Sequence, residues 1–268
     1  MNDKSILKRV LMTSFVSLFI FSIYAQIGPY EPSSGQAGKD VVWVPTSQVL
    51  VDKMLDMAQV KPGDYLMDLG SGDGRLVITA AKRGATATGV EYNPRMVKYS
   101  KEKAAEEGVS SKAHFVEADL FKTDLSKADV ITLFLLTNLN LQLRPTLLNL
   151  KPGTHIVSNT FNMGDWEPDK EETVNNCGSG FCTALLWIVP AKVEGTWKLD
   201  NGKLVLQQKY QKVTGTWNNQ KITEGHINGT TISFKVNKET YIGRIAENKI
   251  QGIIITNNGA RKWMAAVQ

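Results

Sequence analysis

The sequence has little cysteine and no glycine-lysine-serine/threonine phosphate-binding loop. Among 268 residues only Cys177 and Cys182 are cysteines, within NNCGSGFC. No histidine lies close to them in the sequence, so the pair lacks the ligand count of a zinc site, and we predict neither a metal site nor a catalytic thiol. Four intervening residues, two of them glycines, allow a tight hairpin closed by a disulfide, which suits an oxidising compartment. Two separate buried thiols are the alternative.

The chain also lacks an arginine cluster or an aromatic platform, which argues against nucleic acid as a partner. Residues 39–190 carry 16 Lys and Arg against 19 Asp and Glu, whereas residues 191–268 carry 12 against 5. The basic excess therefore lies in the C-terminal part, where it favours acidic partners such as anionic lipid or envelope polymer. A solvated basic surface is the alternative.

Residues 1–25 are typical of a signal peptide or an N-terminal anchor. Lys4, Lys8 and Arg9 precede sixteen uncharged residues that end at Ala25, a plausible cleavage position. This run is shorter than the roughly 20 residues that span a bilayer. We expect an exported chain, periplasmic or secreted, or a membrane-anchored one, with residues 26–39 as a polar linker; a buried N-terminal helix is the alternative.

Residues 40–190 alternate short apolar runs with segments of helical period. The pattern predicts strands at 64–70, 85–91, 113–119, 128–136 and 153–160. The clearest helix is predicted over 93–108, with Asn93 as N-cap, Pro94 at its first position and Gly108 at its end. This alternation is typical of an α/β fold with a doubly wound, Rossmann-like, mostly parallel sheet.

Residues 191–268 follow a different pattern. Apolar residues alternate with polar ones in runs such as TISFKVN and KWMAAV, and DNG, NGT and NNG turns separate the runs. We predict an antiparallel β domain of about six to eight strands, a small barrel or sandwich.

The first predicted strand leads into a glycine-rich turn, residues 68–74, with the sequence DLGSGDG. Its G-x-G-x-G spacing is one residue shorter than the G-x-G-x-x-G fingerprint of dinucleotide sites. Asp68 and Asp73 would repel a pyrophosphate, so the turn favours a zwitterionic ligand that carries an ammonium group.

Acidic residues also end the next two predicted strands. Glu91, 21 residues beyond Gly70, suits hydrogen bonds from ribose hydroxyls, and Asp119 suits one from an adenine amine. Capping of local turns is the alternative for both. Open α/β sheets bind ligands at the carboxyl ends of their strands, so we expect the three segments to form one crevice.

With these motifs, residues 40–190 resemble the class I, seven-strand S-adenosylmethionine-dependent methyltransferases. DLGSGDGR, GVEYN and EADLF look like three of their motifs, while VWVPTSQVLVDKML and FNMGDWEPD resemble a bacterial branch related to the membrane-anchored protein-lysine methyltransferases of mitochondria. The resemblance implies S-adenosyl-L-methionine as cofactor. The cofactor-binding residues that it implies, together with their loop neighbours, are Asp68, Gly70, Ser71, Gly72, Asp73, Gly74, Glu91, Tyr92, Asn93, Asp119 and Leu120.

Methyl transfer requires an aligned nucleophile and exclusion of water rather than a strong acid or base. Candidates for contact with the acceptor follow the fourth and fifth strands: Asn138 and Asn140, then Asp165 and Trp166. Asn140 would accept a hydrogen bond from an incoming amine, and Trp166 would form a channel wall. Helix capping and core packing are the alternatives.

The sequence therefore predicts an S-adenosylmethionine-dependent methyltransferase, with a protein lysine as the favoured acceptor and the β domain as a docking or anchoring module. A small-molecule methyltransferase is one alternative. A non-enzymatic envelope-binding protein with a vestigial cofactor site is another, although the intact motifs argue against it. Membrane or envelope association is expected through the N-terminal segment and the basic β domain.

Overall fold

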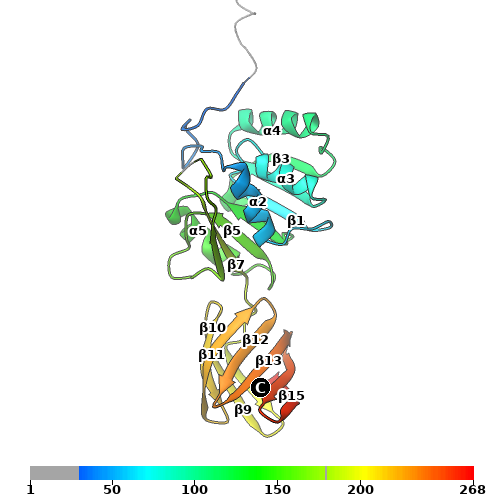
Figure 1. Cartoon of the computed structure of the whole chain (residues 1–268), viewed down its shortest axis with the longest axis vertical. Helices are drawn as coiled ribbons and strands as arrows, with labels where there is room; N and C mark the ends of the chain where they lie inside the picture. The colour runs from blue at the N-terminus through cyan, green and yellow to red at the C-terminus, as the bar shows by residue number, and fades with distance from the viewer. Residues whose placement is uncertain (1–29, 179) are drawn as a thin grey trace, which may run out of the picture. The chain divides into compact units, whose positions relative to one another are not determined.

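The computed structural model describes residues 30–178 and 180–268 (Figure 1). The predicted signal peptide or anchor, residues 1–25, lies outside the described residues, as do residues 26–29 of the predicted linker. Among the described residues, no helix is long and apolar enough to cross a membrane. Residues 34–268 form one compact unit with an α/β part and a β-barrel, whose hydrophobic cores are separate.

The α/β part is built on a seven-stranded sheet in the order β3-β2-β1-β4-β5-β7-β6. The first five strands are parallel, and β7 and β6 complete the sheet in antiparallel pairing. The strands are β1 (Tyr65–Leu69), β2 (Thr86–Glu91), β3 (Ala113–Glu117), β4 (Val130–Leu133), β5 (His155–Asn159), β6 (Lys170–Thr173) and β7 (Thr183–Ile188). All five predicted strands are present, so the mostly parallel Rossmann-like sheet is confirmed.

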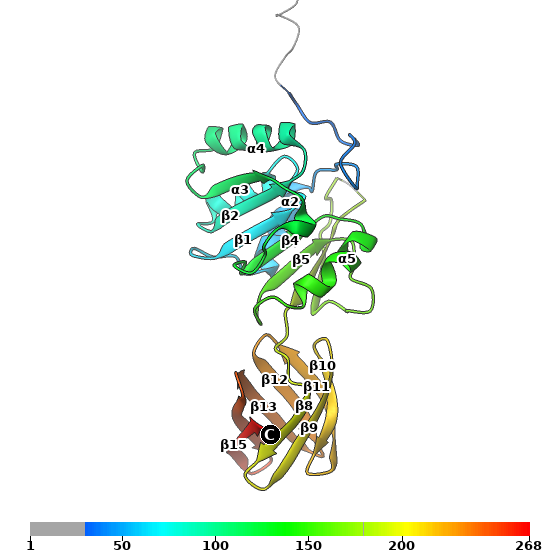
Figure 2. The same ribbon diagram turned by 180° about the vertical axis from the view of Figure 1, so that it is seen from behind.

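Helices cover both faces of this sheet because its strand residues point alternately to either side. In β1, Leu66 belongs to one core and Met67 to the other. The helices are α2 (Gln48–Met57), α3 (Arg75–Lys82), α4 (Pro94–Glu106), η1 (Leu120–Lys122, a 3-10 turn) and α5 (Thr137–Leu147). The core of Leu66 includes α2, α3 and α4, and that of Met67 includes α5. Figure 1 shows α2 on the near side, and the view from behind in Figure 2 shows α5 there.

The predicted start of α4 is confirmed. The Asn93 side chain accepts a hydrogen bond from the backbone N–H of Arg95, and Pro94 occupies the first turn. At the other end, Gly108 adopts a φ of 70° just beyond the helix. Local capping chemistry therefore sets both ends of this helix.

The C-terminal part is a closed antiparallel barrel, so the barrel alternative is confirmed over the sandwich. Its eight strands are β8 (Gly195–Leu199), β9 (Gly202–Lys209), β10 (Lys212–Trp217), β11 (Gln220–Asn228), β12 (Thr231–Val236), β13 (Glu239–Ala246), β14 (Lys249–Thr256) and β15 (Gly259–Val267). Aromatic side chains fill its interior: the Phe234 ring stacks on Tyr241 at 4.9 Å between centroids, and Trp217 contacts both Tyr241 and Trp263.

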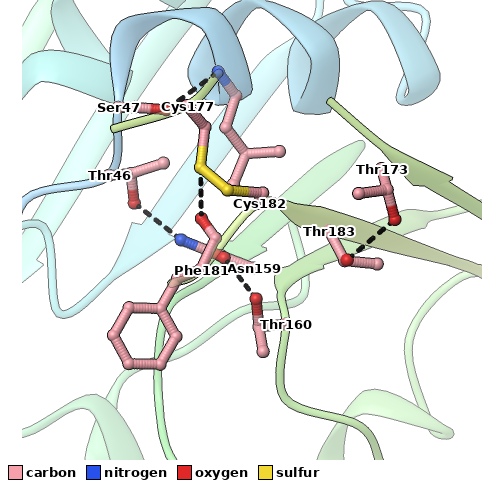
Figure 3. Close-up of a disulfide and its surroundings, with 10 residues drawn as sticks. Thr46, Ser47, Asn159, Thr160, Thr173, Cys177, Phe181, Cys182 and Thr183 are labelled. Atoms are coloured by element: carbon pink, nitrogen blue, oxygen red, sulfur yellow. Dashed lines mark hydrogen bonds between the residues drawn. A yellow bond between two sulfur atoms is a disulfide. The ribbon is translucent and has the colours of Figure 1, made fainter. Parts of the chain in front are cut away.

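Cys177 and Cys182 form a disulfide just before β7, which confirms the predicted bridge (Figure 3). The bridge closes a short loop between β6 and β7, and Phe181 lies inside this loop. The loop therefore has a covalent constraint next to the carboxyl end of the sheet.

Candidate active site

A pocket lies at the carboxyl ends of the parallel strands. Nine of the predicted cofactor residues line it: Asp68, Gly70, Ser71, Asp73, Glu91, Tyr92, Asn93, Asp119 and Leu120. Gly72 and Gly74 belong to the same loop without lining the pocket. The folding of the sheet thus brings together segments from the ends of β1, β2 and β3, as the topology of an open α/β sheet requires.

The glycine loop needs glycine for backbone conformation and for close approach. Gly72 and Gly74 adopt φ values of 54° and 79°, a region that favours glycine. A Cβ at Gly72 would collide with the Trp43 indole, and a Cβ at Gly74 would lie 2.6 Å from the Phe115 ring. The turn therefore packs tightly against the segment before α2 on one side and against β3 on the other.

Asp68 is a buried carboxylate at the end of β1. The Thr132 hydroxyl donates a hydrogen bond of 2.7 Å to its Oδ1. Burial raises the pKa of Asp68 to about 7, and the negative charges of Asp73 and Glu91 act in the same direction. A ligand ammonium group beside Asp68 would favour its ionised form, so this position fits the cationic end of a zwitterion.

Asp73 lines the same pocket, but its carboxylate is already engaged by Arg75. The guanidinium Nε lies 3.0 Å from both carboxylate oxygens, and Nη2 lies 2.6 Å from Oδ2. Arg75 Nη1 also donates to the backbone carbonyl of Thr46. The ion pair offsets the negative charge that the sequence places in this loop.

Glu91 ends β2 and organises the backbone around it. Its Oε2 accepts from the N–H of Gly72 at 3.0 Å, and its Oε1 accepts from the N–H of Asn93 at 2.9 Å. Each oxygen retains a second lone pair, so the carboxylate can also accept from two neighbouring hydroxyl groups of a ribose.

Asp119 follows β3 and is held by two donors. The N–H of Phe121 donates to Oδ1 at 3.0 Å, and Lys39 Nζ lies 3.1 Å from Oδ2. These two contacts, the backbone one first, lower the pKa of Asp119. The Lys39 ammonium also lies 5.1 Å from the centre of the Tyr92 ring.

Lys39 belongs to residues 36–46, all of which line the pocket. The sequence predicts a linker over the first four of them, and we named none of the others as a site residue. Trp43 exchanges backbone hydrogen bonds with Gly35 and Gln36, which gives the segment a defined shape. Composition alone hides this role because residues 36–40 are polar or small and the apolar run that follows them is short. The only signal is that residues 42–55, VWVPTSQVLVDKML, already resemble a family motif.

Thr46, at the end of this segment, is buried and lies between the two sides of the site. Its carbonyl accepts from Arg75, next to the glycine loop, and its Oγ1 accepts from Asn159 Nδ2 at the end of β5 (Figure 3). One residue therefore joins the loop after β1 to the loop after β5.

The structure places the two predicted asparagines differently from our hypothesis. Asn138 is exposed on α5, whereas Asn140 is fully buried, and neither lines the pocket. Asn140 Nδ2 donates to the carbonyl of Phe161 at 2.9 Å and lies 3.3 Å from that of Asn162. Asn140 Nδ2 thus holds the loop after β5.

Asp165 and Trp166 also lie away from the pocket. The ion pair with Lys209 and hydrogen bonds donated by Tyr210 and Arg144 hold the pKa of Asp165 well below its usual range. Trp166 has no exposed surface and stacks on Tyr210 at 5.9 Å between ring centroids. The structure therefore places Trp166 in the hydrophobic core and not in the lining of this pocket.

Comparisons with known proteins agree with this geometry. Residues 68–170 match the ANTKMT methyltransferase domain family. A protein-lysine N-methyltransferase of Saccharolobus islandicus (strain REY15A) is 40% identical over 152 residues, which are 56% of this chain and 94% of that protein. A lysine N-methyltransferase of Homo sapiens that is named for an ATP synthase subunit is 34% identical over 161 residues, 59% of this chain and 68% of that protein.

Among solved structures, an RNA methyltransferase from Salinibacter ruber in complex with S-adenosyl-L-homocysteine is 43% identical, with a TM-score of 0.53. The match covers 56% of this chain and 96% of that one. Fold, pocket and relatives together define a class I methyltransferase that uses S-adenosylmethionine. Within that class, the chain belongs to the family of protein-lysine N-methyltransferases that the relatives from Saccharolobus and Homo sapiens represent. The family-domain match lies entirely within the α/β part.

Proposed function

We propose that this enzyme transfers the methyl group of S-adenosylmethionine to the side-chain amine of a lysine in a protein. The observation that carries the proposal is the pocket, which joins an acidic end, at Asp68, Glu91 and Asp119, to an apolar end after β4. The relatives named as lysine methyltransferases support the choice of acceptor.

The acidic end fits the cofactor in three places. Asp68 would pair with the cofactor's ammonium group, Glu91 would accept from its ribose hydroxyls, and Asp119 would accept from its adenine amine. When bound, the cofactor supplies an electrophilic methyl group on a sulfonium. Asp119 can take this role once Lys39 shifts from its carboxylate or shares it.

The apolar end suits a lysine side chain. Leu133, Phe134, Leu135 and Leu139 line it, and they follow or end β4. An apolar environment disfavours the ammonium form of an amine, so it lowers the pKa of an incoming lysine and increases the neutral, nucleophilic fraction. Alignment and exclusion of water then account for catalysis without a dedicated base.

Mass spectrometry with heavy-methyl S-adenosylmethionine tests this proposal. The full-length chain is incubated with a protein extract, with a small-molecule fraction and with RNA, because the Salinibacter ruber structure is named as an RNA methyltransferase. We expect label on lysine side chains in the protein fraction. Label confined to metabolites or RNA would overturn the lysine proposal, and cofactor binding without label anywhere would favour a non-catalytic role.

We further propose that the enzyme is exported or membrane-anchored and contacts an anionic membrane through its barrel. The disulfide supports an oxidising compartment. The outer face of β13, β14 and β15 supports contact with lipid, because four apolar side chains on it are 37–42% exposed: Ile242, Ile253, Ile255 and Met264. Lys262 lies opposite Ile253 in the same sheet, so a cation accompanies the apolar surface.

Two experiments test this location. N-terminal sequencing of the mature chain, with a compartment-specific reporter fused after Gln268, is expected to show export or anchoring, and a cytoplasmic signal with Met1 retained would contradict it. Vesicles of phosphatidylglycerol are expected to sediment the protein, with Ile253→Ser and Lys262→Gln weakening the effect. Equal sedimentation with phosphatidylcholine would rule out the charge-dependent contact.

A further inference from the structure

The strand order indicates from which side the methyl acceptor reaches the pocket. In the sheet, β3, β2 and β1 are neighbours, and their carboxyl ends carry Asp119, Glu91 and Asp68 in that order. In the same order, these acids suit the adenine, the ribose and the amino-acid end of the cofactor. The next strands in the sheet are β4, β5 and β7. With the cofactor's parts assigned to the first three strand ends, the other three remain for the acceptor.

Three phenylalanines gather over those other strand ends. Phe134 follows β4, Phe161 follows β5, and Phe181 precedes β7. The ring centroids lie 6.1 Å apart for Phe134 and Phe161, 5.3 Å for Phe134 and Phe181, and 5.8 Å for Phe161 and Phe181. All three are partly exposed, and Phe134 lines the pocket itself. They form one continuous aromatic surface, which we call the phenylalanine trio.

Separate contacts hold the backbone of two members of the trio, Phe161 and Phe181. The buried Asn140 donates to the carbonyl of Phe161, and the Ser158 hydroxyl donates to the same carbonyl at 2.7 Å. Phe181 lies in the loop closed by the disulfide, and its carbonyl oxygen is 3.6 Å from Cys177 Sγ (Figure 3). The disulfide loop therefore fixes the backbone that presents the third ring.

We propose that the phenylalanine trio is the acceptor surface of the enzyme, against which the methylene chain of a lysine lies while its amine reaches the methyl group, and that the disulfide is a positioning device for Phe181. This inference rests on the proposed lysine acceptor. Aromatic faces suit this ligand because they contact the apolar stem and attract an ammonium group at its end. In the transfer, the neutral amine nitrogen forms a bond to the methyl carbon as the carbon–sulfur bond breaks. The bond's electron pair stays on sulfur, and the product ammonium later releases a proton to water.

The first test uses n-butylamine, which is the lysine side chain without its backbone, as acceptor and as ligand. In enzyme saturated with S-adenosyl-L-homocysteine, we expect butylammonium to shift the phenylalanine ring resonances in NMR spectra. With heavy-methyl cofactor, Phe161→Ala and Phe181→Ala are expected to raise the KM for butylamine by about 3- to 10-fold with a smaller change in kcat. Phe181→Leu, which keeps an apolar side chain, should recover part of the loss. Val116→Ala, an exposed position on β3, is the matched control.

The second test concerns the disulfide. The double variant Cys177→Ser and Cys182→Ser, and reduction of the wild type with dithiothreitol, are both expected to raise the KM for butylamine about as much as Phe181→Ala does. Affinity for S-adenosyl-L-homocysteine should stay within about twofold, since neither cysteine lines the cofactor pocket. Dithiothreitol should not affect the double variant, which controls for other actions of the reductant.

The outcomes separate this inference from the proposed function. Methylation of butylamine that is indifferent to the trio variants and produces no ring shifts would overturn the acceptor surface and leave lysine methylation standing. Ring shifts without methylation of butylamine or of any protein lysine would support the surface as an amine site and overturn the lysine reaction. An unchanged KM after reduction would overturn the positioning role of the disulfide.

Discussion

The α/β part and the barrel use their strands in opposite ways. In the α/β part, the strand ends open onto a pocket that is lined by the buried Asp68 and by four further acidic residues. In the barrel, the inward positions are closed by large side chains such as Phe234 and Trp263, which are 1% and 7% exposed. The pocket of this enzyme therefore lies at the carboxyl ends of a sheet, whereas the barrel interior is filled by packed side chains that contribute stability.

The sharpest test of this contrast is Phe234→Ala in the barrel core. Removal of a buried aromatic ring is expected to lower the free energy of unfolding by about 3 to 5 kcal/mol. Affinity for S-adenosyl-L-homocysteine should remain within about twofold while the α/β part is folded. Urea unfolding and calorimetry measure the two quantities, with Ser233→Ala on the same strand as control. A parallel loss of cofactor affinity would show that the two cores depend on each other.

In the pocket, we expect Asp68→Asn to lower the affinity for the cofactor product, which the barrel variant leaves unchanged. The side chain keeps its shape and an acceptor for Thr132 but loses its charge, so affinity for S-adenosyl-L-homocysteine should fall by about 1 to 3 kcal/mol. Calorimetry against Glu117→Gln, an exposed acid on β3, isolates the effect of position. Equal losses of affinity in both variants would indicate that the ligand responds to the overall negative charge and not to a specific ion pair with Asp68.

Asp68 should also give the cofactor site a pH dependence near neutrality. Its pKa in the folded chain is about 7, above the ordinary 3.8, so the folded state binds a proton more tightly than the unfolded state does. Its contribution to stability therefore falls as pH rises from about 4 to about 7, while cofactor affinity rises as the carboxylate ionises. Unfolding and binding measured from pH 5 to about 9 should show both trends in the wild type, and neither of them in Asp68→Asn. Persistence of the affinity trend in that variant would assign it to another group.

The smallest expected effect is that of the disulfide on stability. Cys177→Ser with Cys182→Ser should lower the free energy of unfolding by about 1 to 2 kcal/mol, because the bridge closes only a short loop. Alkylation before reduction, followed by mass spectrometry, checks that the bridge forms in protein recovered from an oxidising compartment. Labelling of both thiols there would contradict the pairing.

Local patterns predicted which strand ends and turns line the pocket. The glycine turn, the strand-end acids and the cap of α4 depend on residues close together in sequence, so their spacing carries the information. The antiparallel pair β6 and β7 escaped prediction because β6, Lys170–Thr173, is largely exposed and polar. Its place in the sheet is decided by pairing with β7.

The surroundings of the residues that follow β5 could not be predicted because their contacts are distant in sequence. Trp166 is buried by Trp187 and by Tyr210 of the barrel, about twenty and forty residues further along the chain. Nothing in FNMGDWEPD indicates that Tyr210 covers this indole. The pocket role of Trp43 has the same origin, since the ring meets Gly72 only after the sheet has formed.

Thr46 has a consequence for how the two substrates affect each other. It is hydrogen-bonded to Arg75 beside the glycine loop and to Asn159 at the end of β5. A shift of either segment would therefore move Thr46, which is also the partner of the other segment. We therefore expect the occupancy of the cofactor pocket and that of the acceptor surface to be energetically coupled. Such coupling is reciprocal: the factor by which bound cofactor changes acceptor affinity equals the factor by which bound acceptor changes cofactor affinity. A buried threonine would then make the affinity of each ligand depend on whether the other is bound.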